Sequence, residues 1–188
     1  VCSEKLLEKL DMKDKLEGRQ ELIAGINHMG WLLEIRDKDG NDLYPEIKKR
    51  AAKKNAEEKH DDMVRLEYIR HLGYYCTESS EHNAEYNPFF IKSNYPVMIE
   101  EFNIPLDEYP RRCVEQIEGW KKEREDILKD GKITHERSHE YASYIMEAVV
   151  TDKPYKIGGN VLNKGYIDNL PEDACVEVPC YIDGTGVH

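Results

Sequence analysis

Two segments of the chain bring together residue types that metal and acid–base chemistry require. The first, Gly25-Ile26-Asn27-His28-Met29-Gly30-Trp31, directly follows an apolar stretch. A histidine flanked by Gly and Asn at the end of a strand can direct a ring nitrogen into a cleft and bind a metal ion. One histidine cannot hold a metal without partner ligands, so a merely hydrogen-bonded His28 is the alternative interpretation.

The second segment covers residues 74–90 and is the densest polar and aromatic stretch in the sequence. Aromatic faces stack on pyranose rings, while amides and carboxylates bind hydroxyl groups. Acid–base chemistry is open to several of its side chains, namely Glu78, Glu81, His82, Glu85 and Tyr86. A solvated loop with aromatic residues packed beneath it is an equally good interpretation.

A third polar segment covers residues 159–171 and is followed by Val176-Glu177-Val178-Pro179. Its Asn and Gly residues suit turn geometry, so the sequence favours strand, turn and strand over a catalytic role. Signatures of other sites do not occur: the sequence contains no GxGxxG, GxxxxGK[ST], GxSxG or HExxH. The residues themselves therefore indicate a polar, sugar-compatible cleft with one candidate metal ligand.

The elements that must position these segments follow from hydrophobic periodicity, which predicts one α+β unit. Ser3 is expected to cap the first helix, Pro45 to occupy the first turn of the second, and Gly73 to end the third. Residues 74–95 are expected to form a loop. The expected helices cover residues 3–12, 44–54, 61–72, 106–130 and 138–150, and the expected strands cover 21–27, 31–35, 155–162, 166–167 and 174–182.

Composition excludes several classes of function. The net charge of −11 over 188 residues argues against nucleic acid or an anionic membrane as a partner. No apolar run approaches the length of a membrane span. The five cysteines are irregularly spaced without CxxC pairs, which favours reduced thiols in a cytoplasmic protein over disulfides or a zinc site. The first residues lack an initiator Met and a signal pattern, as expected of a piece of a longer protein.

Taken in order, the segments resemble family 4 glycoside hydrolases, and among them the melibiase-type α-galactosidases. The resemblance covers essentially the whole chain and implies the C-terminal catalytic domain of a lactate/malate dehydrogenase-like fold, α+β with helices and a mainly antiparallel sheet. It rests on residues 25–29, 64–67, 72–74, 77–82, 84–86, 105–110, 112–116, 140–143, 159–161, 168–171 and 176–178.

The resemblance also implies a reaction. In this family bound NAD+ oxidises the sugar at C3, a base removes the acidified C2 proton, a divalent metal such as Mn2+ stabilises the enediolate, and the aglycone leaves by elimination. Water then adds, and the NADH reduces the ketone. By position His28 corresponds to the metal ligand and Tyr86 to the C2 base, with Glu85 as the competing candidate. Substrate contacts are implied for Asn27, Arg65, Glu78 and His82.

A small α-galactoside such as melibiose is the implied substrate, and a homo-oligomer the implied state of the full-length protein. The family's NAD-binding Rossmann domain and a metal-binding cysteine are expected upstream of Val1, and its final helices beyond His188. Residues 1–188 should then lack an NAD site and be inactive alone. The alternatives are a sister activity (α-glucosidase, α-glucuronidase or α-galacturonidase), a 2-hydroxyacid dehydrogenase, and a non-catalytic sugar-binding or assembly module.

Overall fold

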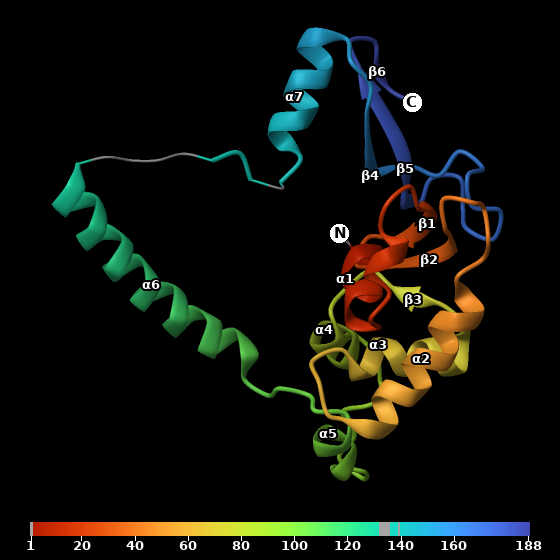
Figure 1. The fold of residues 1–188 in the computed structure, drawn as a ribbon, viewed down its shortest axis with the longest axis vertical. Helices are drawn as coiled ribbons and strands as arrows, with labels where there is room; N and C mark the ends of the chain where they lie inside the picture. The colour runs from red at the N-terminus through yellow and green to blue at the C-terminus, as the bar shows by residue number, and fades with distance from the viewer. Residues whose placement is uncertain (1, 132–135, 139) are drawn as a thin grey trace.

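Helices and antiparallel strands make up the computed structural model, which describes residues 2–131, 136–138 and 140–188 (Figure 1). The helices are α1 (Cys2–Lys9), the 3-10 helix η1 (Lys13–Lys15), α2 (Tyr44–Glu57), α3 (Met63–Leu72), α4 (Ser80–Tyr86), α5 (Val97–Glu101), α6 (Glu108–Asp130) and α7 (Ala142–Thr151). The strands are β1 (Gln20–Ile26), β2 (Met29–Arg36), β3 (Tyr75–Cys76), β4 (Tyr155–Leu162), β5 (Cys175–Asp183) and β6 (Gly186–Val187).

One sheet connects the two halves of the chain, with strand order β3-β2-β1-β5-β4 and β6 paired to β5. Every pairing among the described strands is antiparallel. β1 and β2 form a hairpin whose two-residue turn is Asn27-His28. β5 joins this hairpin where Glu177 pairs with Gly25. The predicted α+β fold with a mainly antiparallel sheet is confirmed, and the sheet brings the third polar segment beside the first.

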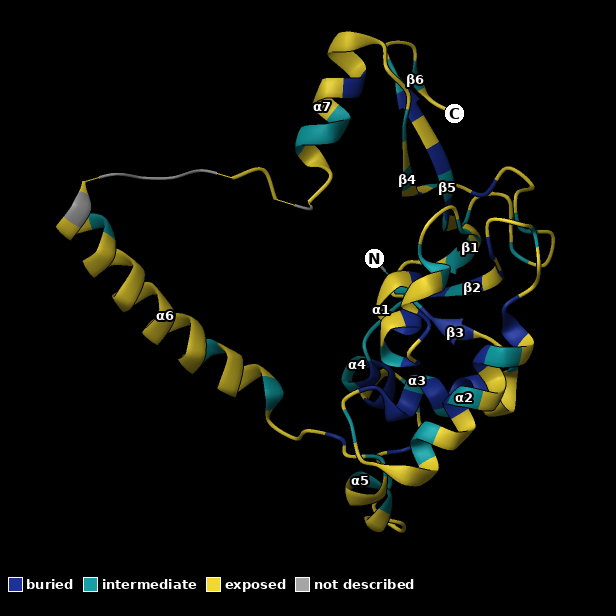
Figure 2. Cartoon of the chain, viewed as in Figure 1, coloured by how far each residue is buried: buried dark blue, intermediate teal, exposed yellow. Residues whose placement is uncertain are grey.

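The main core lies between the sheet and the first three α-helices. Leu6 and Leu7 of α1, Leu32 of β2 and Ile47 of α2 are completely buried, and Tyr75 of β3 closes the cluster. A second cluster gathers around Tyr68 and Phe90, and a third lies on the β4–β5 hairpin. Figure 2 shows the buried residues most densely gathered in β3 and α3, below β1 and β2 in this view, while α1 and α2 carry buried residues only in part.

The predicted loop at residues 74–95 is wrong, because β3 and α4 lie within it. The buried residues of α4 are Ser80, Asn83 and Ala84, two of them polar, so the helix carries no hydrophobic periodicity. Asn83 Nδ2 instead donates hydrogen bonds to the carbonyls of Glu78 and Ser79, both at 3.0 Å. Ser80 Oγ also donates to Asp62 Oδ1 at 2.9 Å, so hydrogen bonds and the single buried Ala84, not an apolar stripe, hold this helix to the body.

Two smaller predictions are also wrong. Ser3 does not cap α1 from outside; it is buried within the helix and accepts a hydrogen bond of 2.9 Å from Arg19 Nε. The predicted strand at 166–167 is a turn region, because the buried Asn163 donates to the carbonyls of Ile167 and Leu170 at 2.8 and 2.9 Å and curls the loop back. The short helix α5 was not predicted at all.

α6 extends away from the main body, whereas α7 lies beside β4 and β5 (Figure 1), where Tyr144 stacks on Tyr155. α6 matches the predicted helix and ends at Gly131 in the left-handed conformation. Its apolar residues Val114, Ile117 and Trp120 are each more than half exposed, so the predicted apolar face does not pack within the described chain. α7 begins later than the predicted 138–150, a range that includes residue 139 outside the described residues.

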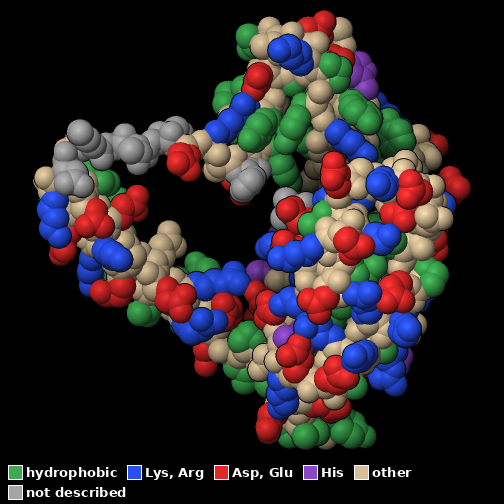
Figure 3. Space-filling model, viewed as in Figure 1, with side chains coloured by type: hydrophobic (Ala, Val, Ile, Leu, Met, Phe, Trp, Pro, Cys, Tyr) green, Lys and Arg blue, Asp and Glu red, His purple; other side chains and the backbone are tan. Residues whose placement is uncertain are grey.

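Exposed α6 is also rich in charged side chains, whereas apolar ones gather over α7 and the neighbouring strands (Figure 3). Within the described residues, no helix has both the length and the apolar character needed to cross a membrane.

Candidate functional site

A polar cleft of about 1150 Å³ opens between the two halves of the sheet. The β1–β2 turn, the start of α3 and the segment before α4 form one wall, and α7 with the β4–β5 hairpin forms the other. Four of the predicted site residues border it: Asn27, His28, Arg65 and Glu78. The topology thus brings together side chains that are up to 51 positions apart, counted from Asn27 to Glu78.

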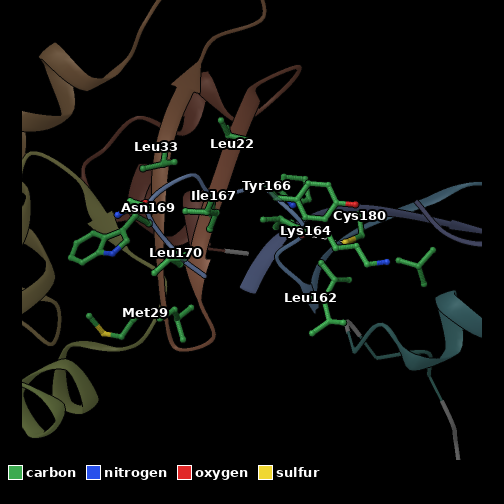
Figure 4. Close-up of a pocket in the computed structure, with 18 of the residues that line it drawn as sticks. Leu22, Met29, Leu33, Leu162, Lys164, Tyr166, Ile167, Asn169, Leu170 and Cys180 are labelled. Carbon is green, nitrogen blue, oxygen red and sulfur yellow. Dashed lines mark hydrogen bonds between the residues drawn. The ribbon is translucent and has the colours of Figure 1, made fainter. Parts of the chain in front are cut away.

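A second hollow, of about 1000 Å³, lies elsewhere on the sheet and is mainly aliphatic. Leu22 and Leu33 of the β1–β2 hairpin gather there with Ile167 and Leu170 of the loop before β5 (Figure 4). None of the predicted catalytic, metal or substrate residues borders it. Because acid–base and metal chemistry need titratable side chains, the polar cleft is the candidate site.

His28 stands at the tip of the β1–β2 turn, in the left-handed region with φ of 64°. Its Nδ1 contacts Glu78 Oε2, and its side chain is 59% exposed. With Nδ1 engaged by a carboxylate, Nε2 is the ring nitrogen that remains for a metal ion, and the carboxylate fixes the ring's orientation and tautomer. The arrangement fits the predicted ligand role of His28.

Glu78 is the most strongly perturbed carboxylate of this wall. Burial alone would raise its pKa, but contacts with His28, the Ser79 backbone N–H and His82 outweigh burial and lower the pKa to about 2. The Ser79 N–H donates to Glu78 Oε1 at 2.7 Å, and His82 Nδ1 lies 3.3 Å from the same oxygen. Glu78 therefore holds a fixed negative charge between two histidines.

Tyr86 joins this cluster from the last position of α4. Its ring stacks on His82 with centroids 5.7 Å apart and meets His28 edge-on at 6.5 Å. The i,i+4 spacing places His82 and Tyr86 on one side of the helix, whereas the adjacent Glu85 is exposed and points elsewhere around the helix. The geometry favours Tyr86 over Glu85 beside His28, although neither Tyr86 nor His82 borders the cleft itself.

A metal ion at His28 would need more ligands than this one side chain supplies. No group of three or more His, Cys, Asp or Glu side chains within the described ranges could hold a metal ion. His28 is a chemically suitable single ligand, with an imidazole nitrogen left available beside a carboxylate.

Several cleft residues were missed by the sequence reasoning. Arg19, Lys156, Glu177 and the stacked pair Tyr144–Tyr155 also border the cleft. Burial raises the pKa of Glu177, while the charge of His28 opposes the shift. Its carboxylate lies over β4, where a Cβ on Gly158 would come within 3.2 Å of Oε1. Glu177 could have been recognised from the sequence, because it is the single carboxylate in the otherwise mainly apolar run 176–182.

Gly25 determines the path of the turn that carries His28, and its replacement gives a testable result. At φ of 154°, a Cβ would lie 2.6 Å from the Met29 carbonyl oxygen and 2.8 Å from Gly30 Cα, both backbone atoms. Gly25→Ala should therefore lower the free energy of unfolding by about 1–3 kcal/mol in urea titrations. Gly119→Ala is the matched control, because nothing lies within 4 Å of its Cβ. Equal stability of the two variants would contradict the assigned turn geometry.

Comparisons with known proteins identify the family to which the chain belongs. Residues 23–188 match the model of the family 4 glycosyl hydrolase C-terminal domain. The chain is 60% identical over 183 residues to an α-galactosidase of Bacillus subtilis and 29% identical over 175 residues to one of Rhizobium meliloti. The two matches include 97% and 89% of this chain, respectively. The same matches span only 41% and 36% of the relatives' own lengths.

Among solved structures, a 6-phospho-α-glucosidase from gut microorganisms, in complex with NAD and Mn2+, superposes with a TM-score of 0.64 at 20% identity. The match covers 100% of this chain and 44% of that protein, and at this identity it shows a shared fold. The family model matches most of the length of the chain, and the α+β architecture agrees with it. The chain therefore belongs to the family 4 glycosyl hydrolases and corresponds to their C-terminal domain.

Proposed function

We propose that this chain is the sugar-facing catalytic part of an α-galactosidase that works with NAD+ and a divalent metal such as Mn2+. The observation that carries the proposal is the pairing of His28 with Glu78, beside Tyr86, on the wall of a polar cleft. The chain's 60% identity with the Bacillus subtilis α-galactosidase supports α-galactosides as substrates over the substrates of the sister activities.

The proposed domain organisation is a partial one. Residues 1–188 form the C-terminal catalytic region, and the NAD-binding domain belongs to the rest of the full-length enzyme, in keeping with a chain that spans 41% of its Bacillus relative. The absence of a GxGxxG segment from the sequence supports this division. The remaining metal ligands are likewise contributed by the rest of the enzyme, and the isolated chain does not turn over substrate.

The residues of this chain divide the work at the sugar. A bound divalent ion would polarise sugar oxygens and stabilise negative charge, and NAD+ would accept a hydride from C3. His28 would hold the metal through Nε2 while Glu78 fixes the ring. Tyr86 removes the C2 proton through its side-chain oxygen, and Asn27, Arg65 and His82 orient the substrate's hydroxyl groups. Glu85 remains the competing base.

The proposed partners are a small α-galactoside such as melibiose and further copies of the same full-length enzyme. The net charge of −11 supports neither nucleic acid nor an anionic membrane as a partner. The cytoplasm is the proposed location, supported by five free cysteines.

The proposal is tested with the full-length enzyme that carries this chain. Hydrolysis of p-nitrophenyl α-galactoside should require both NAD+ and Mn2+ and stop when either is removed. Activity indifferent to NAD+ would contradict the family mechanism. A panel of α-glucosides, α-glucuronides and α-galacturonides discriminates the sister activities. The isolated chain, assayed in parallel, should show no turnover; sugar binding by it without metal or NAD+ would instead support a binding module.

Glu78 provides a pH-dependent prediction on stability. Its folded-state pKa of about 2 lies below the ordinary 4.5, so ionised Glu78 stabilises the fold above pH 4.5, and this stability is lost as pH falls toward 2. The side chain is 14% exposed, so the contribution at pH 7 is on the order of 3 kcal/mol. Urea titrations of Glu78→Gln should show this deficit at pH 7 and a shrinking one at pH 4 and 3. A deficit constant with pH would contradict the assignment.

A further inference from the structure

A buried network at the start of α3 lies directly behind the cleft. Asp62 is only 2% exposed, and three side chains donate to its carboxylate. Tyr75 OH donates to Oδ2 at 2.6 Å, Ser80 Oγ donates to Oδ1 at 2.9 Å, and Arg65 Nε also donates to Oδ1. A buried carboxylate is tolerated because these donors and the opposite charge replace its hydration.

Arg65 is held on three sides. Its side chain is 12% exposed, its Nε is bound to Asp62, and its guanidinium carbon lies 4.4 Å from the centroid of the Tyr75 ring. Its backbone N–H donates to Ser80 Oγ at 3.1 Å. Yet Arg65 borders the polar cleft, and within the described part of the chain neither Nη1 nor Nη2 donates a hydrogen bond.

From this geometry we infer that Asp62 is a positioning residue, which holds the Nε edge of Arg65 so that Nη1 and Nη2 face the cleft and donate to adjacent hydroxyl oxygens of the bound sugar. The guanidinium is a rigid planar fork, so fixing one edge and one face determines where the other edge points. This inference rests on the substrate role proposed for Arg65.

The same network ties the cleft wall together. Tyr75 belongs to β3, which pairs with β2 at Leu32, and Ser80 is the first residue of α4, the helix that ends in Tyr86. Asp62 therefore connects the arginine with the two elements that flank Glu78. A preorganised donor loses less conformational entropy when substrate binds, so the expected signature is in substrate affinity.

The test uses the full-length enzyme and separates KM from kcat. Asp62→Asn keeps the shape of the side chain but removes its charge, and should raise KM for p-nitrophenyl α-galactoside about 10- to 100-fold with a smaller change in kcat. An unchanged KM would overturn the inference. Inactivity of the unmodified enzyme would instead contradict the proposed function and is read from the same assay.

Guanidinium rescue distinguishes positioning from a general structural role. Arg65→Ala should regain activity when millimolar guanidinium is added, because Asp62 remains to hold the added cation, and Asp62→Asn/Arg65→Ala should not. Equal rescue of both would overturn the inference. If Asp62→Asn does not fold, Tyr75→Phe takes its place, because it removes only the 2.6 Å hydrogen bond from Tyr75 to Asp62. Adding Tyr75→Phe to Arg65→Ala should weaken the rescue by guanidinium. Undiminished rescue would also overturn the inference.

A second paired arginine, partly exposed and away from the cleft, controls for the loss of an arginine ion pair as such. Arg50 is bound by Glu46 at 2.7 Å and by the carbonyls of Leu10 and Asp11, and it does not border the cleft. Arg50→Ala should leave KM within twofold, and guanidinium should not stimulate it. A KM change in Arg50→Ala equal to that in Asp62→Asn would show that lost stability, not positioning, produces the effect.

Discussion

Replacing His28 with alanine is expected to lower kcat/KM of the full-length enzyme about a thousandfold or more and to abolish the response to Mn2+. His28 is the one predicted metal ligand in the chain, and its Nδ1 is already engaged by Glu78. A metal that stabilises developing charge on sugar oxygens contributes several kcal/mol to catalysis, which at about 1.4 kcal/mol per factor of ten corresponds to this loss. Metal titrations of activity measure the effect.

His71→Ala is the matched control for this experiment. His71 is also surface-exposed and also pairs with a glutamate, Glu67 at 2.9 Å, but it does not border the cleft. It should keep its activity and its Mn2+ dependence within about twofold of the unmodified enzyme. Metal-dependent activity that survives in His28→Ala would show that the assigned ligand is wrong.

Leu32→Ala is expected to destabilise the chain by about 2–5 kcal/mol. Leu32 lies in β2 with no exposed surface, pairs in register with Tyr75, and packs in the main core beneath the turn that carries His28. Removing three buried carbons forfeits their transfer free energy and leaves a cavity. Urea unfolding of the chain measures the difference.

The neighbouring Leu33 controls for composition and strand propensity. It points to the opposite side of β2 and is 37% exposed, so Leu33→Ala should cost about 1 kcal/mol or less in the isolated chain. Equal losses for the two variants would contradict the register of β2.

Much of the fold could be predicted because its signals are local. Apolar spacing and the terminal Gly73 define α3, and Pro45 marks the first turn of α2. The hairpin β1–β2 also follows from two apolar runs around a short polar turn. α4 escaped prediction because Ser80 and Asn83 are buried through hydrogen bonds, which leave no hydrophobic period to detect.

The site was predicted in its parts but not in its connections. His28, Glu78, His82 and Tyr86 were identified separately, and the structure places them in one cluster. That Glu78 contacts His28, rather than simply facing solvent or substrate, depends on pairing β2 with β3 across 45 positions at Trp31 and Cys76. Glu177 was missed because its approach to the cleft depends on one pairing, with Gly25.

The location of solvent hydrogen in the product tests the proposed reaction most directly. The full-length enzyme, with NAD+ and Mn2+, would hydrolyse p-nitrophenyl α-galactoside in D2O, and NMR would examine the released galactose. If Tyr86, or the competing Glu85, removes the C2 proton before the aglycone leaves, galactose should carry deuterium at C2. Galactose formed at full rate with only protium at C2 would contradict elimination, and with it the role proposed for Tyr86 and the cluster around His28.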